Sequence, residues 1–270
     1  MNLILFLPAL ILGTLEGLTE FLPISSTGHL IIAGEILDFT GERAKTFEIV
    51  IQLGAILAVC WYYRAKLVEV ARGITHNAIT QRFLGNLALA FLPAAFLGLL
   101  LHRFIKDHLF NPITVAAALI LGGVVILLVE RSKGEARVHA VEDMGWPEAL
   151  KIGCVQALAL IPGTSRSGAT IIGGLVFGLS RQTATEFSFF LAIPTMFAAT
   201  FYESVNNWHL LQDGDLSLFG IGFTAAFIFG LVAVKALLHF VKNHSFCVFA
   251  YYRIVFGGVV LSYFWLVPGS

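Results

Sequence analysis

The stretch that decides the fold is EGLTEFLPISSTGH, residues 16–29, because it puts strongly polar side chains inside the first apolar segment of the chain. It holds Glu16, Glu20, a proline, a run of three hydroxyl side chains and His29. Ionisable groups at membrane depth are costly, so they usually serve a function. The stretch therefore predicts a break in a membrane segment, and we expect the polar residues at the break to form a functional site.

The composition around this stretch indicates an all-α integral membrane protein. Of 270 residues, 57% are hydrophobic and 13% are charged, with a mean hydropathy of +0.84 and no net charge. About 20 helical residues cross ~30 Å of hydrocarbon. Six apolar runs meet that length and are predicted as transmembrane helices: 44–63, 83–102, 112–129, 184–202, 218–241 and 246–266. The neutral balance gives no reason to expect nucleic acid as a partner.

Two further expectations come from the ends and the cysteines. Residues 1–12 lack the basic region of a cleavable signal and are expected to stay in the fold. Cys60, Cys154 and Cys247 all lie in apolar runs and carry no metal or disulfide signature. We expect all three thiols to be small buried hydrophobic groups of the core.

The distribution of positive charge predicts the orientation, because cytoplasmic loops are rich in Lys and Arg. Loops 64–82 and 131–151 hold four cations each, whereas loop 204–217 holds Asp213 and Asp215 and no cation. The cations are Arg64, Lys66, Arg72 and Arg82 in the first loop, and Arg131, Lys133, Arg137 and Lys151 in the second. The first two loops are predicted inside, and loop 204–217 and both termini outside.

The chain also repeats itself within a single membrane domain, 1–270. LPISS (22–26) matches IPGTS (161–165), and LGGVV (121–125) matches FGGVV (256–260). A third match joins LHRFIKDHLF, which begins at residue 101, to LHFVKNHSF, which begins at residue 238. Matches in the same order at similar spacing favour a duplication, with copies at roughly 1–132 and 145–268.

Each copy has one polar-interrupted segment, 9–38 or 148–180, followed by three full spans. If each interrupted segment enters and leaves on one side, each copy crosses an odd number of times, and the second copy is upside down. This predicts an inverted-topology repeat with two re-entrant helical hairpins. Non-helical backbone is tolerated at membrane depth only inside protein or beside a wet cavity. The loops PISSTGH and PGTSRSGAT are therefore expected to meet.

The residues at that meeting point favour phosphoryl transfer. Glu16 and Glu20, at i and i+4, share one helix face and could hold Mg²⁺ or Ca²⁺, share a proton or pair with an arginine. Arg166 offers a fork that fits phosphate, and His29 could act as acid or base. Small and hydroxyl residues around both loops suit an anion; they are Ser25, Ser26, Thr27, Gly163, Thr164, Ser165, Ser167 and Gly168.

A transporter is the main alternative, because inverted repeats with broken helices also build lipid or ion carriers. In that interpretation Arg166 and the hydroxyls bind a lipid phosphate, and the glutamates couple cations to its movement. The hydroxyl and histidine cluster beside two acids favours catalysis, with flipping of the product lipid as an added hypothesis. In the last span, Arg253 suggests an internal ion pair whose partner the sequence does not identify.

EGLTEFLPISSTGH and PGTSRSGATI resemble the paired signatures of the bacterial undecaprenyl-diphosphate phosphatase family, also called the bacitracin-resistance family. AKTFEIVIQLGAILAV (44–59) and EFSFFLAIP (186–194) extend the similarity over essentially the whole chain. The resemblance implies a hydrolase of the bacterial inner membrane that converts undecaprenyl diphosphate to undecaprenyl phosphate. That product is the carrier lipid of peptidoglycan synthesis, and bacitracin resistance would follow.

The resemblance also assigns residues. It places the family's acidic pair on Glu16 and Glu20, its serine on Ser26, its histidine on His29 and its phosphate-binding arginine on Arg166. It implies a divalent metal on the two glutamates and a site open to the periplasm. Ser26 and His29 both stay open as the nucleophile, with Ser26 preferred. The sequence also leaves open whether the protein forms a homodimer.

Overall fold

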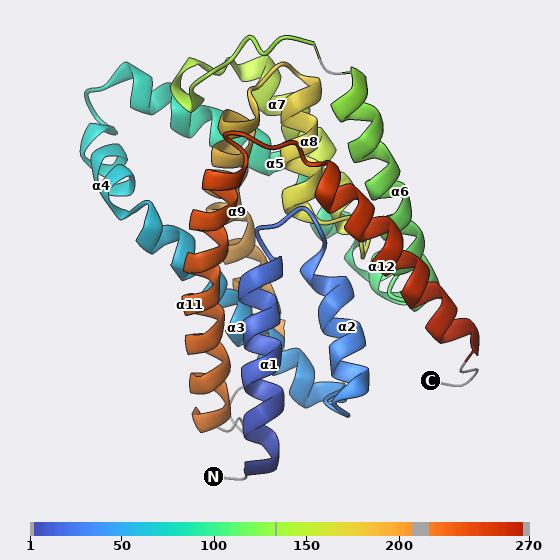
Figure 1. Ribbon diagram of the computed structural model, residues 1–270. Coiled ribbons are helices and arrows are strands. Elements are labelled where there is room, and N and C mark those ends of the chain that lie inside the picture. Colours follow the sequence, from blue (N-terminus) through green and yellow to red (C-terminus); the bar gives the residue numbers. More distant parts are fainter. Residues whose placement is uncertain (1–2, 133, 207–215, 267–270) are drawn as a thin grey trace.

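The computed structural model describes residues 3–132, 134–206 and 216–266, and this part of the chain is almost entirely helical (Figure 1). The first half contains α1 (Leu3–Thr19), α2 (Ser26–Ile36), α3 (Gly41–Tyr62), α4 (Arg64–Gly73), α5 (Ala78–His108) and α6 (Pro112–Ser132). The second half contains η1 (Val141–Asp143), α7 (Trp146–Gln156), η2 (Ala157–Leu160), α8 (Arg166–Val176), α9 (Arg181–Asn206), α11 (Leu216–Phe240) and α12 (Cys247–Leu266).

Six of the described helices are long and apolar enough to cross a membrane. Their spans are Ala44–Tyr62, Ala78–Ile105, Pro112–Ser132, Arg181–Asn206, Leu216–Phe240 and Cys247–Trp265. Each overlaps one of the six apolar runs in the sequence, so that prediction is confirmed. The spans begin and end a few residues away from the predicted limits, because helices extend through polar residues at the ends of an apolar run.

Four of the shorter helices form two hairpins, α1 with α2 and α7 with α8, whose members contact each other. Figure 1 shows the α1–α2 turn lying in the interior of the molecule, near the turn between α7 and α8. Prolines open both turns, at Pro23 and Pro162. A proline cannot donate to a helix ladder and restricts the residue before it, which explains why helix stops at both places.

The two hairpins match closely in their backbone. Helices α2 and α8 are both 11 residues long, and each follows a serine with φ of 70°, Ser25 or Ser165. Each also ends in a tight turn, with Phe39 N donating to Gly34 O at 2.8 Å and Leu179 N donating to Gly174 O at 2.9 Å. The match is at an offset of 140 residues, one more than the offset of the two prolines. Ser26 and Arg166 therefore occupy the same place, the first residue of the helix.

The long helices pack around these hairpins. Helix α11 lies against α1 and α3, α12 lies along α6, and α5 lies against α7 (Figure 1). Backbones come very close where α1 passes α11, since a Cβ added at Gly13 would be 2.4 Å from the Gly222 carbonyl oxygen. A stripe of small residues permits this close approach.

The two cation-rich segments lie on the same side of the molecule, as predicted. Lys66 Nζ is 2.5 Å from Glu142 Oε1, and Arg82 donates to the Glu142 carbonyl oxygen. Asn86 Nδ2 adds a hydrogen bond to the Met144 carbonyl oxygen at 2.8 Å. The prediction for loop 204–217 depends on Asp213 and Asp215, which lie outside the described residues, as does Lys133.

The cysteine prediction is wrong in part. Cys60 and Cys247 are half-buried, and Cys154 on α7 is exposed. An apolar run does not distinguish a core position from one on the outer surface of a membrane helix, because both are apolar. The three cysteines are free thiols, as the absence of a disulfide pattern indicated.

Candidate active site

The two hairpin turns meet, which confirms the central geometric expectation. Ser167 Oγ donates to the carbonyl oxygen of Leu22 at 2.7 Å, and Ser165 Oγ does so at 3.5 Å. The two serine hydroxyls are also 3.1 Å apart. The Leu22 carbonyl group, which lies in the turn after α1, is thereby satisfied inside the protein, as a buried turn requires.

Two helix N-termini point into this meeting point, because α2 begins at Ser26 and α8 begins at Arg166. The first N–H groups of a helix have no intrahelical acceptor and lie at the positive end of its dipole. At α8, Ser165 Oγ caps the Gly168 N–H at 3.1 Å, while the earlier N–H groups have no such cap. Such paired N-termini suit an anion with several oxygens, such as a phosphate.

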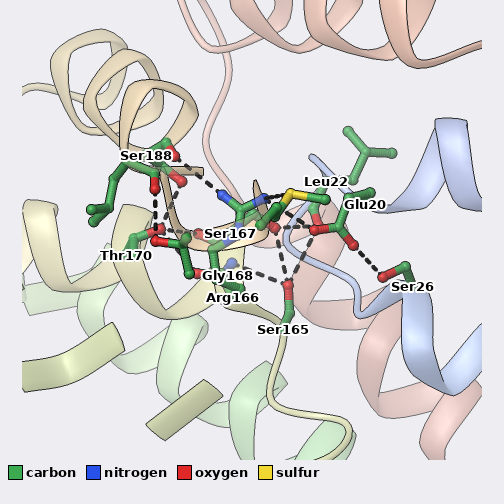
Figure 2. Close-up of polar contacts among 12 residues, drawn as sticks. Glu20, Leu22, Ser26, Ser165, Arg166, Ser167, Gly168, Thr170 and Ser188 are labelled. Atoms are coloured by element: carbon green, nitrogen blue, oxygen red, sulfur yellow. Dashed lines mark hydrogen bonds and ion pairs between the residues drawn. The ribbon is translucent and has the colours of Figure 1, made fainter. Parts of the chain in front are cut away.

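The Glu20 carboxylate joins the two hairpins (Figure 2). Ser26 Oγ donates to Glu20 Oε2 at 2.5 Å, and Arg166 Nη2 donates to Glu20 Oε1 at 3.1 Å. The Glu20 and Arg166 side chains are each 11% exposed, so their ion pair is largely shielded from solvent but still accessible. A serine hydroxyl bonded to a carboxylate, with a guanidinium beside it, is an arrangement in which the serine proton can be accepted as the oxygen attacks.

Other contacts orient the Arg166 guanidinium. Nη1 donates to the Ser188 carbonyl oxygen at 3.1 Å, and Nη2 lies 3.2 Å from Met196 Sδ. Ser188 is itself fixed by Thr170, with their hydroxyl oxygens 2.6 Å apart. The Arg166 Nε–H is buried and finds no hydrogen-bond partner within the described ranges. A buried donor without an acceptor is unfavourable, so the side chain keeps capacity to bind an anionic ligand.

Glu16 is the second notable group. Its backbone carbonyl accepts from Glu20 N at 2.9 Å, so the helical turn continues and both carboxylates share one face, as the i, i+4 spacing indicated. Glu16 is fully buried, and neither carboxylate oxygen has a hydrogen-bond partner among the residues that the structure describes. A buried charge is normally paired or bound to metal.

The Glu16 and Glu20 carboxylates are the type of ligand that could hold a divalent cation. Hard cations take oxygen ligands, and Mg²⁺ in particular is often held by one or two carboxylates together with substrate phosphate oxygens. Within the described residues no cluster of three His, Cys, Asp or Glu side chains could hold a metal. Glu16 and Glu20 could therefore supply only part of a coordination sphere, which a diphosphate substrate and water would complete.

Both ring nitrogens of His29 are already engaged. Nδ1 is 2.7 Å from the Ser25 carbonyl oxygen, and Nε2 is 2.6 Å from the Tyr252 hydroxyl oxygen. Because a carbonyl only accepts, Nδ1 carries a proton, and in the neutral ring Nε2 accepts from Tyr252. Phe256 stacks on the ring at a centroid distance of 4.2 Å. The imidazole is thus fixed, and it anchors the backbone just before Ser26.

The remaining residues predicted to bind substrate lie around the same turns. Ser25, Ser165 and Ser167 are buried, and Thr27 and Thr164 are half-buried. Contacts from helices far away in sequence were not anticipated. Tyr252, Ser188 and Met196 reach the site although no pattern in their own segments predicts it.

The predicted ion pair of Arg253 is wrong. In the part of the chain that the structure describes, its guanidinium pairs with no carboxylate and donates only to backbone carbonyl oxygens of α6 and the two turns. Carbonyl groups at broken helices can satisfy a buried guanidinium in the same way as an acid, but backbone acceptors leave no residue signature in the sequence.

The family described as bacitracin resistance protein BacA matches residues 9–259. The chain belongs to that family. A BacA-family relative from Aromatoleum aromaticum, named undecaprenyl-diphosphatase, is 60% identical over 262 residues, covering 97% of this chain and 96% of the relative.

Two further relatives of the same name support the assignment. The protein from Methylobacillus flagellatus is 58% identical over 270 residues, covering 98% of this chain and all of the relative. The protein from Nitrosospira multiformis is 60% identical over 261 residues, covering 97% of this chain and 96% of the relative. The similarity to BacA-family proteins therefore includes both hairpins and the long helices around them.

Proposed function

We propose that this protein is an undecaprenyl-diphosphate phosphatase, which hydrolyses undecaprenyl diphosphate to undecaprenyl phosphate and inorganic phosphate. The observation that carries the proposal is the hydrogen-bonded series Ser26–Glu20–Arg166 at two facing helix N-termini. The names of the relatives identify the lipid. The product is the carrier lipid of peptidoglycan synthesis, and its recycling accounts for the bacitracin resistance after which the family is named.

In the proposed reaction Ser26 Oγ attacks the terminal phosphorus, and the bond from that phosphorus to the bridging oxygen breaks. Glu20 Oε2 accepts the serine proton and passes it to the leaving undecaprenyl phosphate. Water then hydrolyses the phosphoserine and releases inorganic phosphate. Arg166 and the N–H groups at the starts of α2 and α8 bind the phosphoryl oxygens, where charge develops in the transition state.

His29 is the less suitable nucleophile, because Ser25 and Tyr252 occupy both of its nitrogens. Its role in this proposal is to position the backbone of Ser25 and, through it, the Ser26 hydroxyl. Ser25, Thr27, Thr164, Ser165 and Ser167 bind or shape the place of the diphosphate. Glu16 and Glu20 would hold a divalent cation, preferably Mg²⁺, which when bound withdraws charge from the diphosphate oxygens.

The membrane arrangement belongs to the same proposal. We infer that the α1–α2 and α7–α8 hairpins are re-entrant, and that copies at 1–132 and 145–268 form an inverted repeat. The matched backbone of Ser25 and Ser165 supports the duplication. With the cation-rich segments inside, the protein lies in the bacterial inner membrane and its site opens to the periplasm.

Phosphate release from undecaprenyl diphosphate by the purified protein in detergent tests the proposal. We expect release with Mg²⁺ or Ca²⁺ and little with EDTA. Glu20→Gln should abolish it, because it removes the proton acceptor of Ser26. Glu69→Gln, which changes an exposed carboxylate on α4, is the matched control and should behave as wild type. Absence of release by folded wild type with every metal would refute the phosphatase and favour a lipid-phosphate transporter built on the same site.

A further inference from the structure

Arg253 lies in the middle of α12 with only 1% of its surface exposed, and its guanidinium reaches both hairpin turns. A guanidinium has five N–H donors. Here each has a backbone carbonyl acceptor. The contacts are Nε to Leu119 at 3.2 Å, Nη1 to Pro23 at 3.2 Å and Thr164 at 2.9 Å, and Nη2 to Ala118 at 3.0 Å and Gly163 at 3.1 Å.

These acceptors come from three separate parts of the fold. Pro23 lies three residues before the start of α2, and Gly163 and Thr164 lie immediately before the cap of α8. The other two acceptors belong to α6, where Gly122 makes room for the guanidinium. A Cβ at Gly122 would be 2.1 Å from Arg253 Nη2. One side chain thus ties the two turns to each other and to a long helix.

Because the guanidinium is charged, its hydrogen bonds constrain the positions of both turns. Taking a guanidinium out of water costs several kcal/mol unless hydrogen bonds compensate for its hydration. Since the compensation comes from five fixed carbonyl dipoles, any displacement of a turn leaves donors unsatisfied. Arg181 is different: it forms a two-contact pair with the Glu130 carboxylate at 3.0 and 2.6 Å, and among the described residues its guanidinium has no hydrogen bond to either hairpin turn.

We propose that Arg253 is a positioning residue for phosphoryl transfer: it holds the starts of α2 and α8 in register, so that Ser26 and Arg166 face the same phosphoryl group. This inference rests on the proposed function. It assigns to α12 a part in the reaction, although Arg253 itself does not have to touch the substrate.

The first test compares wild type with Arg253→Met and Arg253→Lys in two measurements. Hydrogen–deuterium exchange reports the order of the turns, and steady-state kinetics separates kcat from KM. Displacing reacting groups by about 1 Å can cost ~10²-fold in rate, so we expect kcat to fall roughly 100-fold, with a smaller change in KM. Lysine keeps the charge but offers only three donors, and it should restore little of kcat. Exchange should accelerate in both turns, at 20–28 and 160–168.

Two control pairs separate positioning from general stability. Arg181→Met removes a half-buried arginine that pairs with the buried Glu130, and it should leave kcat within about threefold of wild type below the unfolding temperature. Gly122→Ala moves the Arg253 guanidinium without removing it and should lower kcat about tenfold or more. Gly258→Ala, in the matching motif of α12, adds a methyl group into open space and should behave as wild type.

The proposal is overturned if folded Arg253→Met keeps kcat within about threefold, or if Gly122→Ala matches Gly258→Ala. If Arg253→Met does not fold, the glycine pair still decides the question. A failure of the proposed function is recognised separately, since wild type would then release no phosphate. The exchange measurement would still show whether Arg253 orders both turns.

Discussion

Replacement of Glu16 by glutamine tests whether its bare carboxylate is a metal site. Glu16 is fully buried, and in the described part of the chain neither oxygen has a hydrogen-bond partner. An unsatisfied buried group costs about 1–3 kcal/mol, and more when it is charged. In metal-free buffer, Glu16→Gln should therefore be at least as stable as wild type, because glutamine has the same shape without the charge.

A divalent cation should reverse this order. An ion present at about 100 times its Kd stabilises the folded protein by ~2.7 kcal/mol. For a chain of this size each kcal/mol raises the unfolding midpoint by about 2–4 °C, so wild type should gain roughly 5–10 °C. Glu16→Gln has lost one of the two carboxylates and should gain less than about a third of that. It should also lose metal-stimulated phosphate release.

Thermal unfolding in detergent, with EDTA and with a series of Mg²⁺ concentrations, provides the measurement. Glu69→Gln is the control, since its side chain is 69% exposed and its only described ion pair is with Lys66. Equal midpoint shifts in wild type and Glu16→Gln would refute the metal assignment. A marked loss of stability of Glu16→Gln in EDTA would show instead that the carboxylate has a partner in the folded protein.

Three further substitutions test the roles of the site residues by phosphate release and thermal unfolding. Ser26→Ala should lower kcat by about 10³-fold or more with little change in stability. His29→Gln should lower kcat less. A larger loss of kcat in His29→Gln than in Ser26→Ala would make His29 the nucleophile. Tyr252→Phe removes one hydrogen bond to His29 and should cost ~1 kcal/mol of stability and less than about tenfold in kcat, and a larger kinetic loss would indicate direct chemistry by the hydroxyl. Arg166→Lys keeps the charge but loses the fork, so kcat/KM should fall about 10²-fold, and unchanged kinetics would remove Arg166 from phosphate binding.

Much of the site was predictable because its residues are conspicuous against an apolar background. Glu20, Ser26 and Arg166 stand out in hydrophobic segments, and the repeat indicated that the two turns should meet. The helix spans followed from the length of apolar runs. In each case the sequence carries the physical cause directly, either as a charge that needs a partner or as a length that matches the bilayer.

The rest was hidden for equally physical reasons. The partners of Arg253 are carbonyl groups, which every residue has, so no residue type identifies them. Tyr252 lies 223 residues from His29, and only the packing of α12 against α6 brings it near. Cys154 shows that an apolar sequence does not distinguish buried positions from exposed ones in a membrane protein. The repeat also aligned Ser26 with Ser165 through the prolines, whereas the helices align Ser26 with Arg166.

The contacts of Arg253 have a consequence for which substitutions the protein should accept. A carbonyl oxygen stays in place whatever side chain its residue bears, so positions such as Ala118 and Leu119 can change as far as their own packing allows without disturbing the arginine. Two glycines lack this freedom: Gly122, which lies beside the guanidinium without accepting from it, and the acceptor Gly163. The first makes room for the guanidinium, and the second has φ of +91° and would place a Cβ 2.5 Å from the Val115 carbonyl oxygen. Tolerance to mutation should therefore differ sharply between neighbouring acceptors. It should depend on the room for a side chain and on the φ angle of the residue, and not on the number of hydrogen bonds that its carbonyl accepts.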